Sequence, residues 1–198
     1  MAIQLEKCVI LHIPKTGSDW VRSTCNQATP VRIHEVGEWH SDLDEVREHF
    51  LAQDRPVPFL GTFVRHPLEW YRSAWVYWKE TGRFPRRDSD PRVECDDFEQ
   101  FVRNCQKVEP EGYVSVLIER FVGTEPGEVS CIGRQECLVS DLIRLLKLAG
   151  EEFDEDTVRN SPPRNVRGQK SGSAFPGYSH SLARDVLRHE RRIIDRFY

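Results

Sequence analysis

The chain has 198 residues, of which 38% are hydrophobic and 30% are charged, and its formal net charge is −4. This length accommodates one domain with a buried core, and the slightly acidic balance argues against a dedicated nucleic-acid-binding protein. No apolar run approaches the ~20 residues of a membrane span, and charged residues interrupt the short apolar stretch at the start, unlike a signal peptide. We therefore expect a cytoplasmic protein with neither nucleic acid nor membrane as a partner. The composition leaves its oligomeric state open.

The six cysteines include no Cys-x-x-Cys pair, so neither a zinc site nor a thioredoxin-like redox motif is indicated. Cys8 and Cys131 lie in strand-like runs and Cys105 lies on an apolar helix face, where a reduced thiol packs as a small hydrophobic side chain. We expect buried, reduced cysteines, with disulfide bonds as the alternative.

A buried strand and two helices are predicted at the start of the chain. Residues 7–13 (KCVILHI) form a β-branched apolar run that is typical of a central strand. A polar helical stretch then passes through Trp20 and Thr24. A second helix follows Ser41, its predicted N-cap, because the apolar residues between positions 43 and 51 share one face.

A second strand and helix follow. Residues 58–64 (PFLGTFV) are predicted to form another buried strand. Pro67 then suits the first position of a helix that ends near Gly82. Residues 83–95 are rich in Pro, Arg and Asp, which is typical of an exposed loop.

The next segments complete the predicted sheet. Asp96 and Glu99 form a predicted capping box at the start of a helix. Residues 114–122 and 129–132 are predicted strands, separated by a turn that contains Gly and Pro. Residues 138–148 form a strongly apolar predicted helix that a glycine ends.

The chain closes with a polar segment and a helix. Residues 159–180 are rich in Arg, Ser, Gly and Pro without periodicity, and residues 182–197 predict one amphipathic helix. Alternating strands and helices indicate an α/β fold with a mainly parallel sheet flanked by helices. Because we find no domain boundary or repeat, residues 1–198 are predicted to form a single domain.

The turn after the first strand, residues 13–18 (IPKTGS), suits an anion. Ligands of parallel α/β sheets bind beyond the carboxyl ends of the strands. Gly17 permits close approach of the backbone, and the following helix offers unpaired N–H groups and the positive end of its dipole. Lys15 adds a cation, so the turn suits a phosphate or phosphosulfate. The turn is not a Walker A loop, because its lysine precedes the glycine. The alternative to an anion-binding turn is an ordinary turn with a surface lysine.

The second strand carries a similar arrangement in residues 61–73 (GTFVRHPLEWYRS). Arg65 lies at the carboxyl end of the strand, and Ser73 lies about two turns into the helix, whose side chains lean back toward its N-terminus. A guanidinium and a hydroxyl in these positions are able to bind one anion through hydrogen bonds. The alternative makes Arg65 a salt-bridge partner and Ser73 a solvent-facing residue.

Taken together, these two segments resemble the sulfotransferase family that uses 3′-phosphoadenosine 5′-phosphosulfate (PAPS), whose fold is similar to that of P-loop NTPases. The resemblance implies that PAPS is the cofactor, that adenosine 3′,5′-bisphosphate is the product, and that the first segment holds the 5′-phosphosulfate while the second holds the 3′-phosphate. The residues implied for the 5′ side are Lys15, Thr16, Gly17 and Ser18, and those implied for the 3′-phosphate are Arg65 and Ser73.

Three further stretches are similar to the carbohydrate-sulfotransferase branch of this family: residues 71–75 (YRSAW), 131–136 (CIGRQE) and 164–166 (RNV). The chain departs from the family where Gly17 is followed by Ser-Asp-Trp instead of Gly-Gly-Thr or Gly-Thr-Thr. Asp19 therefore adds a negative charge beside the loop, where it either caps the helix or faces the acceptor.

Sulfuryl transfer resembles phosphoryl transfer, with an in-line displacement that moves charge onto the leaving phosphate. Lys15 is the candidate for neutralising that charge, and this chemistry needs no metal. The general base is expected within residues 32–40 (RIHEVGEWH), where His40 ranks first and Glu35 and Glu38 follow.

Two alternatives remain for this segment. It could be a polar surface connection, or His34, Glu38 and His40 could hold zinc, although the His-Glu-x-x-His pattern is missing. His12 is predicted to be a hydrogen-bonded core residue, and His66 a structural or cofactor-flanking one.

The basic segment 159–180 is a candidate lid. Residues 164–172 (RNVRGQKSG) look similar to the late basic, glycine-containing loop that covers the nucleotide in sulfotransferases. Arg167 and Lys170 are then implied as 3′-phosphate or lid residues. A solvated basic surface is the alternative.

The sequence thus predicts a PAPS-dependent sulfotransferase acting on a hydroxyl of a small molecule or a saccharide. One alternative is a nucleotide-dependent phosphotransferase or kinase, which the missing Walker A order disfavours. Another is a non-catalytic nucleotide-binding module, which Asp19 would favour.

Overall fold

The computed structural model describes residues 2–38, 40–83, 90–164 and 175–198, and the chain divides into two compact units. The first unit comprises Met1–Val64 and Glu119–Asn165, and the second comprises Arg65–Ile118 and Val166–Tyr198. The prediction of a single domain stays a prediction.

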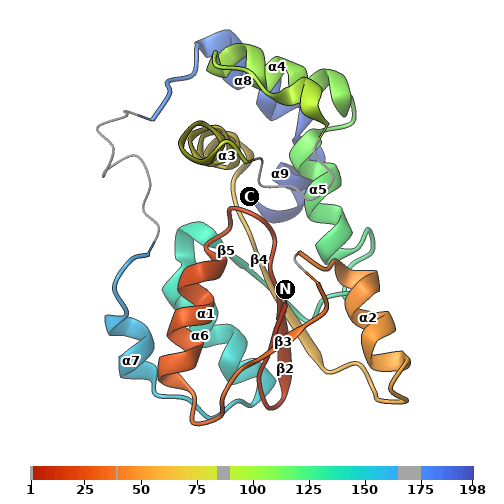
Figure 1. Cartoon of the computed structure of the whole chain (residues 1–198), viewed down its shortest axis with the longest axis vertical. Helices are drawn as coiled ribbons and strands as arrows, with labels where there is room; N and C mark the ends of the chain where they lie inside the picture. The colour runs from red at the N-terminus through yellow and green to blue at the C-terminus, as the bar shows by residue number, and fades with distance from the viewer. Residues whose placement is uncertain (1, 39, 84–89, 165–174) are drawn as a thin grey trace. The chain divides into compact units, whose positions relative to one another are not determined.

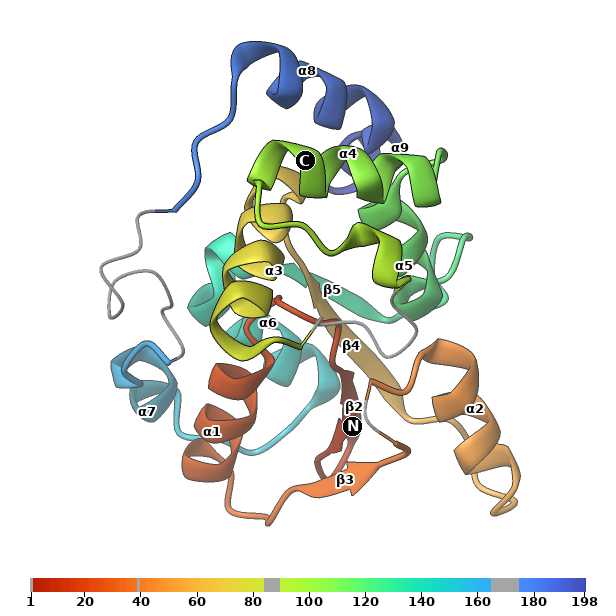
Figure 2. The ribbon, with the colours of Figure 1, turned by 45° about the horizontal axis from the view of Figure 1, so that its top comes forward.

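The first unit contains a five-stranded sheet in the order β3-β1-β2-β4-β5. Its strands are β1 (Ala2–Gln4), β2 (Cys8–Leu11), β3 (His34–Val36), β4 (Phe59–Val64) and β5 (Cys131–Arg134). The pairs β2–β4 and β4–β5 are parallel, whereas β1 is antiparallel to both β2 and β3, with β3 at the edge (Figure 2). The α/β class is confirmed, but the sheet is mixed and not mainly parallel. The connection from β1 to β2 is too short for a parallel crossover.

The two central strands end at the same edge of the sheet. All four residues of β2 are buried, as expected of a strand covered on both faces. Parallel pairing sets Cys8 opposite Phe59 and Leu11 opposite Thr62, and the Thr62 hydroxyl donates to the Leu11 carbonyl over 3.0 Å. The turn after β2 and the residues that continue β4 therefore both leave from the carboxyl edge.

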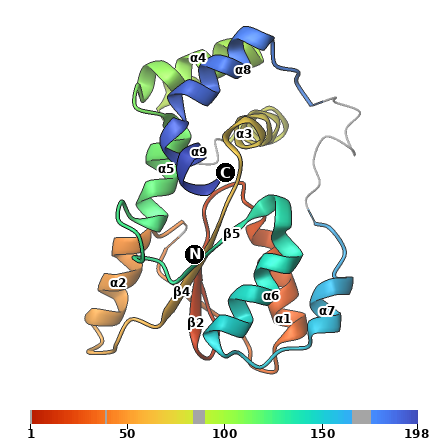
Figure 3. The same ribbon diagram turned by 180° about the vertical axis from the view of Figure 1, so that it is seen from behind.

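Helices cover both faces of this sheet. Helices α1 (Ser18–Ala28), α6 (Leu138–Ala149) and α7 (Glu155–Asn160) lie on one side, and α2 (Leu43–Leu51) lies on the other (Figures 1 and 3). A short 3-10 turn, η2 (Gln135–Cys137), precedes α6. The core beneath α1, α6 and α7 includes Trp20, Cys25, Phe63 and Leu142. Gly61 of β4 permits the approach of α6, since a Cβ there would lie 2.3 Å from Leu145 Cδ1.

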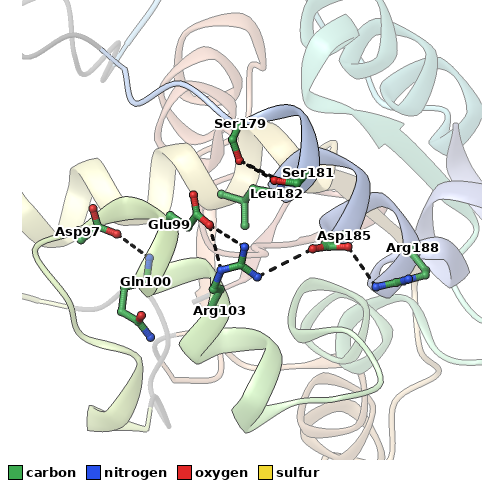
Figure 4. Close-up of polar contacts among 9 residues, drawn as sticks. All are labelled: Asp97, Glu99, Gln100, Arg103, Ser179, Ser181, Leu182, Asp185 and Arg188. Atoms are coloured by element: carbon green, nitrogen blue, oxygen red, sulfur yellow. Dashed lines mark hydrogen bonds and ion pairs between the residues drawn. The ribbon is translucent and has the colours of Figure 1, made fainter.

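The second unit is helical in its described residues. It contains α3 (Pro67–Thr81), η1 (Pro91–Val93), α4 (Phe98–Val108), α8 (His180–His189) and α9 (Arg191–Phe197), and α5 (Tyr113–Val122) begins in it and ends in the first unit. Figure 4 shows Arg103 of α4 between two carboxylates: it donates to Glu99 over 2.6 Å and lies 3.9 Å from Asp185 of α8. Asp185 also accepts from Arg188 over 3.1 Å.

The predicted strand at residues 114–122 is wrong, because this segment forms α5. Its buried residues Val114, Leu117, Ile118 and Phe121 recur at helical spacing. The carboxylate of Glu190 accepts from the backbone N–H groups of Val114 and Ser115 over 3.1 and 2.8 Å. Burial and this cap therefore outweigh the strand preference of a β-branched sequence.

Three helix boundaries in the structure differ from the predicted ones. Asp42, not Ser41, caps α2 and forms a capping box with Glu45, because its carboxylate reaches the N–H three residues on. Asp97, not Asp96, caps α4. The single helix predicted over residues 182–197 is divided at Glu190 into α8 and α9.

Other predictions are confirmed. Pro67 occupies the first turn of α3, which ends at a left-handed Gly82 with φ of 63°, and Gly150 ends α6. All six cysteines are free thiols, but Cys95 is only partly buried and Cys137 is exposed. In the described part of the chain, no helix combines the length and apolar character that crossing a membrane requires.

Candidate functional site

The turn between β2 and α1 is closed by its own hydroxyl groups. Thr16 Oγ1 and Ser18 Oγ both donate to the Ile13 carbonyl, over 2.9 and 3.2 Å. Thr16 is only 2% exposed, so its hydroxyl serves the turn. Both hydroxyls organise the backbone of the turn in this structure, and their binding to a phosphate stays a prediction.

The backbone of this turn is left-handed at two positions. Lys15 has a φ of 68° and Gly17 a φ of 94°. In the described chain only two other non-glycine residues, His40 and Asp54, have positive φ. Such conformations are costly for residues with a Cβ and are concentrated at functional sites. Turns of this kind also direct successive backbone N–H groups toward an anion.

Gly17 is needed for both the conformation and the packing of the turn. A Cβ at this position would lie 2.8 Å from Leu138 Cδ2, in addition to the strain of its positive φ. Gly17 is also the N-cap of α1 and has no side chain to accept from the first turn. Asp19 lies in that first turn, where the helix dipole favours a negative charge.

His40 is held against the strand that leads into the turn. Its Nδ1 lies 3.0 Å from the backbone oxygen of His12, and because a carbonyl oxygen only accepts, Nδ1 carries the proton. Burial lowers the pKa of His40 below its ordinary value. The neutral ring then has its lone pair on Nε2, as a general base requires.

Ser41 organises the turn that carries His40. The Ser41 hydroxyl accepts from the Glu38 backbone N–H over 2.7 Å and donates to the Glu38 carbonyl over 3.2 Å. Gly37 has a φ of 70°, and a Cβ there would lie 2.3 Å from Ser41 Oγ. The residue predicted as a helix cap is therefore buried and closes the turn that includes His40, whose φ is 59°.

Arg22 is a site residue that our sequence reasoning missed. Its Nη1 lies 2.6 Å from Glu35 Oε1, and its Nη2 lies 3.4 Å from His12 Nδ1. The available signal was its place one helical turn after Ser18, on the face of α1 that follows the turn. As predicted, His12 is buried and hydrogen-bonded, with 3% of its surface exposed.

The first unit thus brings together part of the predicted set. Glu35 is paired with Arg22, and its side chain is 43% exposed, while Glu38 and His34 are exposed. His40 and the Arg22–Glu35 pair both contact His12, which precedes the turn directly in the sequence. In the described residues, no group of three or more His, Cys, Asp or Glu side chains is arranged to hold a metal ion.

Arg65 and Ser73 belong to the second unit. Arg65 follows the last residue of β4 directly, and Ser73 lies in the second turn of α3; both are half-buried. His66 caps α3, since its Nδ1 accepts from the Leu68 N–H over 3.3 Å, and its ring meets that of Tyr198 edge-on at 5.0 Å. Its structural role is thereby shown.

The predicted lid residues Arg167 and Lys170 lie outside the described residues. Comparisons of the chain with protein-family models, with curated proteins and with solved structures found no significant match.

Proposed function

We propose that this protein is a PAPS-dependent sulfotransferase that moves a sulfuryl group to a hydroxyl of a small molecule or a saccharide. The observation that carries the proposal is the left-handed Lys15 in a closed turn at the carboxyl end of β2. A cation, a glycine-containing turn and a helix N-terminus together suit a phosphosulfate. The P-loop-like character of the fold is part of the same proposal.

Lys15 and Gly17 have distinct roles in the proposed reaction. PAPS, when bound, supplies the sulfuryl group. Lys15 neutralises the charge that develops on the departing 5′-phosphate, and the backbone around Gly17 approaches the phosphate closely. Positioning and electrostatics are the main contributions a protein makes to such a transfer.

His40 is the proposed general base. Its Nδ1–H donates to the His12 carbonyl at 3.0 Å, which leaves Nε2 of the neutral ring to accept the proton of the acceptor hydroxyl. Burial lowers the pKa of His40, which favours the neutral ring that a general base requires. Glu35 is less suited because it is already paired with Arg22.

The 3′-phosphate is assigned to Arg65 and Ser73. Parallel pairing of β2 and β4 makes the Lys15 turn and Arg65 follow strands that end at one sheet edge. The resemblance of residues 61–73 to the 3′-phosphate segment of sulfotransferases supports this assignment, and Arg167 and Lys170 are further candidates for the same phosphate. A 3′-phosphate distinguishes PAPS from ATP, so this pair accounts for nucleotide selectivity.

Isothermal titration calorimetry with adenosine 3′,5′-bisphosphate and with ADP tests which of these nucleotides the protein prefers. We expect the bisphosphate to bind roughly 10-fold or more tightly than ADP, because charge-assisted contacts to the 3′-phosphate are available to it alone. Arg65→Ala should remove most of this preference, whereas Arg188→Ala, at an exposed position, should keep it. Equal affinities for the two nucleotides would count against the proposal.

Transfer itself is tested with PAPS labelled in the sulfuryl group and a panel of hydroxylated acceptors. Labelled product is the expected result, and Lys15→Ala should lower its rate about 10²–10³-fold. The matched control is Lys107→Ala, which changes an exposed lysine of α4. Turnover of ATP with Mg²⁺ would instead indicate a phosphotransferase, and bisphosphate binding without transfer would indicate a non-catalytic module.

A further inference from the structure

Four residues of the first unit are linked by hydrogen bonds in one chain that passes through His12. Glu35 of β3 holds Nη1 of Arg22 at 2.6 Å, and Nη2 of the same guanidinium lies 3.4 Å from His12 Nδ1. The backbone oxygen of His12 in turn holds His40 Nδ1 at 3.0 Å. A surface carboxylate is thereby connected to the proposed base through an arginine and a buried histidine.

The chemistry of these groups determines where the protons lie. A guanidinium only donates, so Nδ1 of His12 must accept and the proton of its neutral ring lies on Nε2. A carbonyl oxygen only accepts, so His40 carries its proton on Nδ1. The two histidines are therefore expected in opposite tautomers.

From this chain of contacts we infer that Arg22, tethered by Glu35, is the positioning residue of the proposed general base: it fixes His12, and the His12 carbonyl orients the ring of His40. The inference rests on the proposed function for its catalytic meaning. The strained backbone of His40, with a φ of 59°, agrees with it, because such strain persists only where surrounding contacts hold the residue in place.

Electrostatics gives Arg22 a second effect on His40. Burial is the largest influence and lowers the pKa of His40, whereas the hydrogen bond to His12 and the charge of Asp19 raise it. The charge of Arg22 lowers it, since a second positive charge close by is unfavourable. Asp19 and Arg22, both in α1, therefore carry opposite charges and shift the pKa of His40 in opposite directions.

The tautomers are measured first, in the unmodified protein. Long-range ¹H–¹⁵N correlation spectra of the ¹⁵N-histidine-labelled chain separate the two ring nitrogens, and His12→Gln and His40→Gln variants assign the signals. We expect a proton on Nε2 of His12 and on Nδ1 of His40. Finding His40 with its neutral proton on Nε2, or His12 with its neutral proton on Nδ1, would overturn the inference without any reference to activity.

Substitutions of Arg22 test its influence directly. In Arg22→Gln, the NMR titration midpoint of His40 should move to higher pH, and kcat/KM should fall roughly 10-fold, as for other residues that orient a catalytic group. Arg22→Lys keeps the charge and should keep the low midpoint. Asp19→Asn, at an exposed position, should move the midpoint to lower pH. A natively folded Arg22→Gln protein in which the ring signals and tautomers of His12 and His40 are the same as in the unmodified protein would overturn the inference.

These results are distinguishable from failure of the proposed function. The tautomers and midpoints are properties of the chain and need no substrate. If both behave as expected while no acceptor is sulfated, the arrangement around His40 stands and the sulfotransferase proposal fails. If sulfation occurs while Arg22→Gln leaves the ring signals and tautomers of both histidines unchanged, the positioning role fails alone.

Discussion

The Tyr71 hydroxyl donates a 2.6 Å hydrogen bond to the carboxylate of Glu190, and both residues are fully buried, with 0% of their surface exposed. Glu190 also accepts from the Val114 N–H over 3.1 Å and from the Ser115 N–H and hydroxyl, each over 2.8 Å. One carboxylate therefore joins α3, the start of α5 and the junction of α8 with α9. Burial and the nearby carboxylate raise the pKa of Tyr71 well above its ordinary value, so its hydroxyl remains a donor.

Removing this acceptor should destabilise the second unit. Glu190→Gln places an amide donor among groups that only donate to it, and we expect a loss of about 2–4 kcal/mol in the free energy of unfolding. Tyr71→Phe should cost about 1–2 kcal/mol. Urea unfolding followed by circular dichroism measures both. Glu111→Gln is the control, since Glu111 is exposed and lies 3.7 Å from Arg192; a Glu190→Gln variant as stable as this control would contradict the expectation.

Replacing Lys15 by glycine should separate activity from stability. Lys15 has a φ of 68°, which glycine adopts freely, so we expect the free energy of unfolding to stay constant or rise by up to ~1 kcal/mol. Loss of the ammonium should nevertheless lower sulfuryl transfer about 10²-fold.

Asp54→Gly is the matched control for Lys15→Gly, because Asp54 is an exposed residue with a φ of 53°. It should change stability similarly and leave transfer unchanged. Thermal unfolding and initial rates with labelled PAPS provide the comparison. Unaltered transfer by Lys15→Gly would remove Lys15 from the reaction.

The pH dependence should reflect the lowered pKa of His40. As the pH falls, the base is lost only when His40 is protonated, so the acidic limb of kcat/KM should lie below the ordinary histidine pKa of about 6.5. Between the lowered pKa of His40 in the folded chain and its ordinary value in the unfolded chain, the unfolded chain binds more protons. The contribution of His40 to the free energy of unfolding therefore decreases as the pH falls through this window. His40→Gln should abolish the limb and flatten the stability profile in that window. His180→Gln, in α8, should alter neither, and a limb retained in His40→Gln would point to another base.

The contact between β4 and α6 makes a simple prediction about packing. Gly61→Ala would put a Cβ 2.3 Å from Leu145 Cδ1, and the resulting overpacking should cost about 1–3 kcal/mol of unfolding free energy. Gly177→Ala is the control, because no atom lies within 4 Å of a Cβ built there. Equal denaturation midpoints for the two variants would show that α6 moves aside without cost.

The locally encoded features were predictable from the sequence. The apolar runs of β2 and β4, Pro67 at the start of α3, and the glycines that end α3 and α6 all follow from propensities acting over a few residues. The Lys15 turn was identified in the same way, because its position after a buried strand and before a helix is a local property.

Features that depend on contacts distant in the sequence were decided by the tertiary structure. The segment 114–122 carries β-branched residues, yet Glu190 caps it as a helix from 76 residues away. Likewise, no local pattern in the sequence links Arg22, Glu35 and His40 to His12. These residues meet because β1 and β3 add antiparallel to the sheet. By itself, the sequence therefore determined the α/β class, the strands β2 and β4, and the Lys15 turn. Only the folded chain decided which histidine, carboxylate and arginine are connected to His12, because those contacts depend on the path of the backbone.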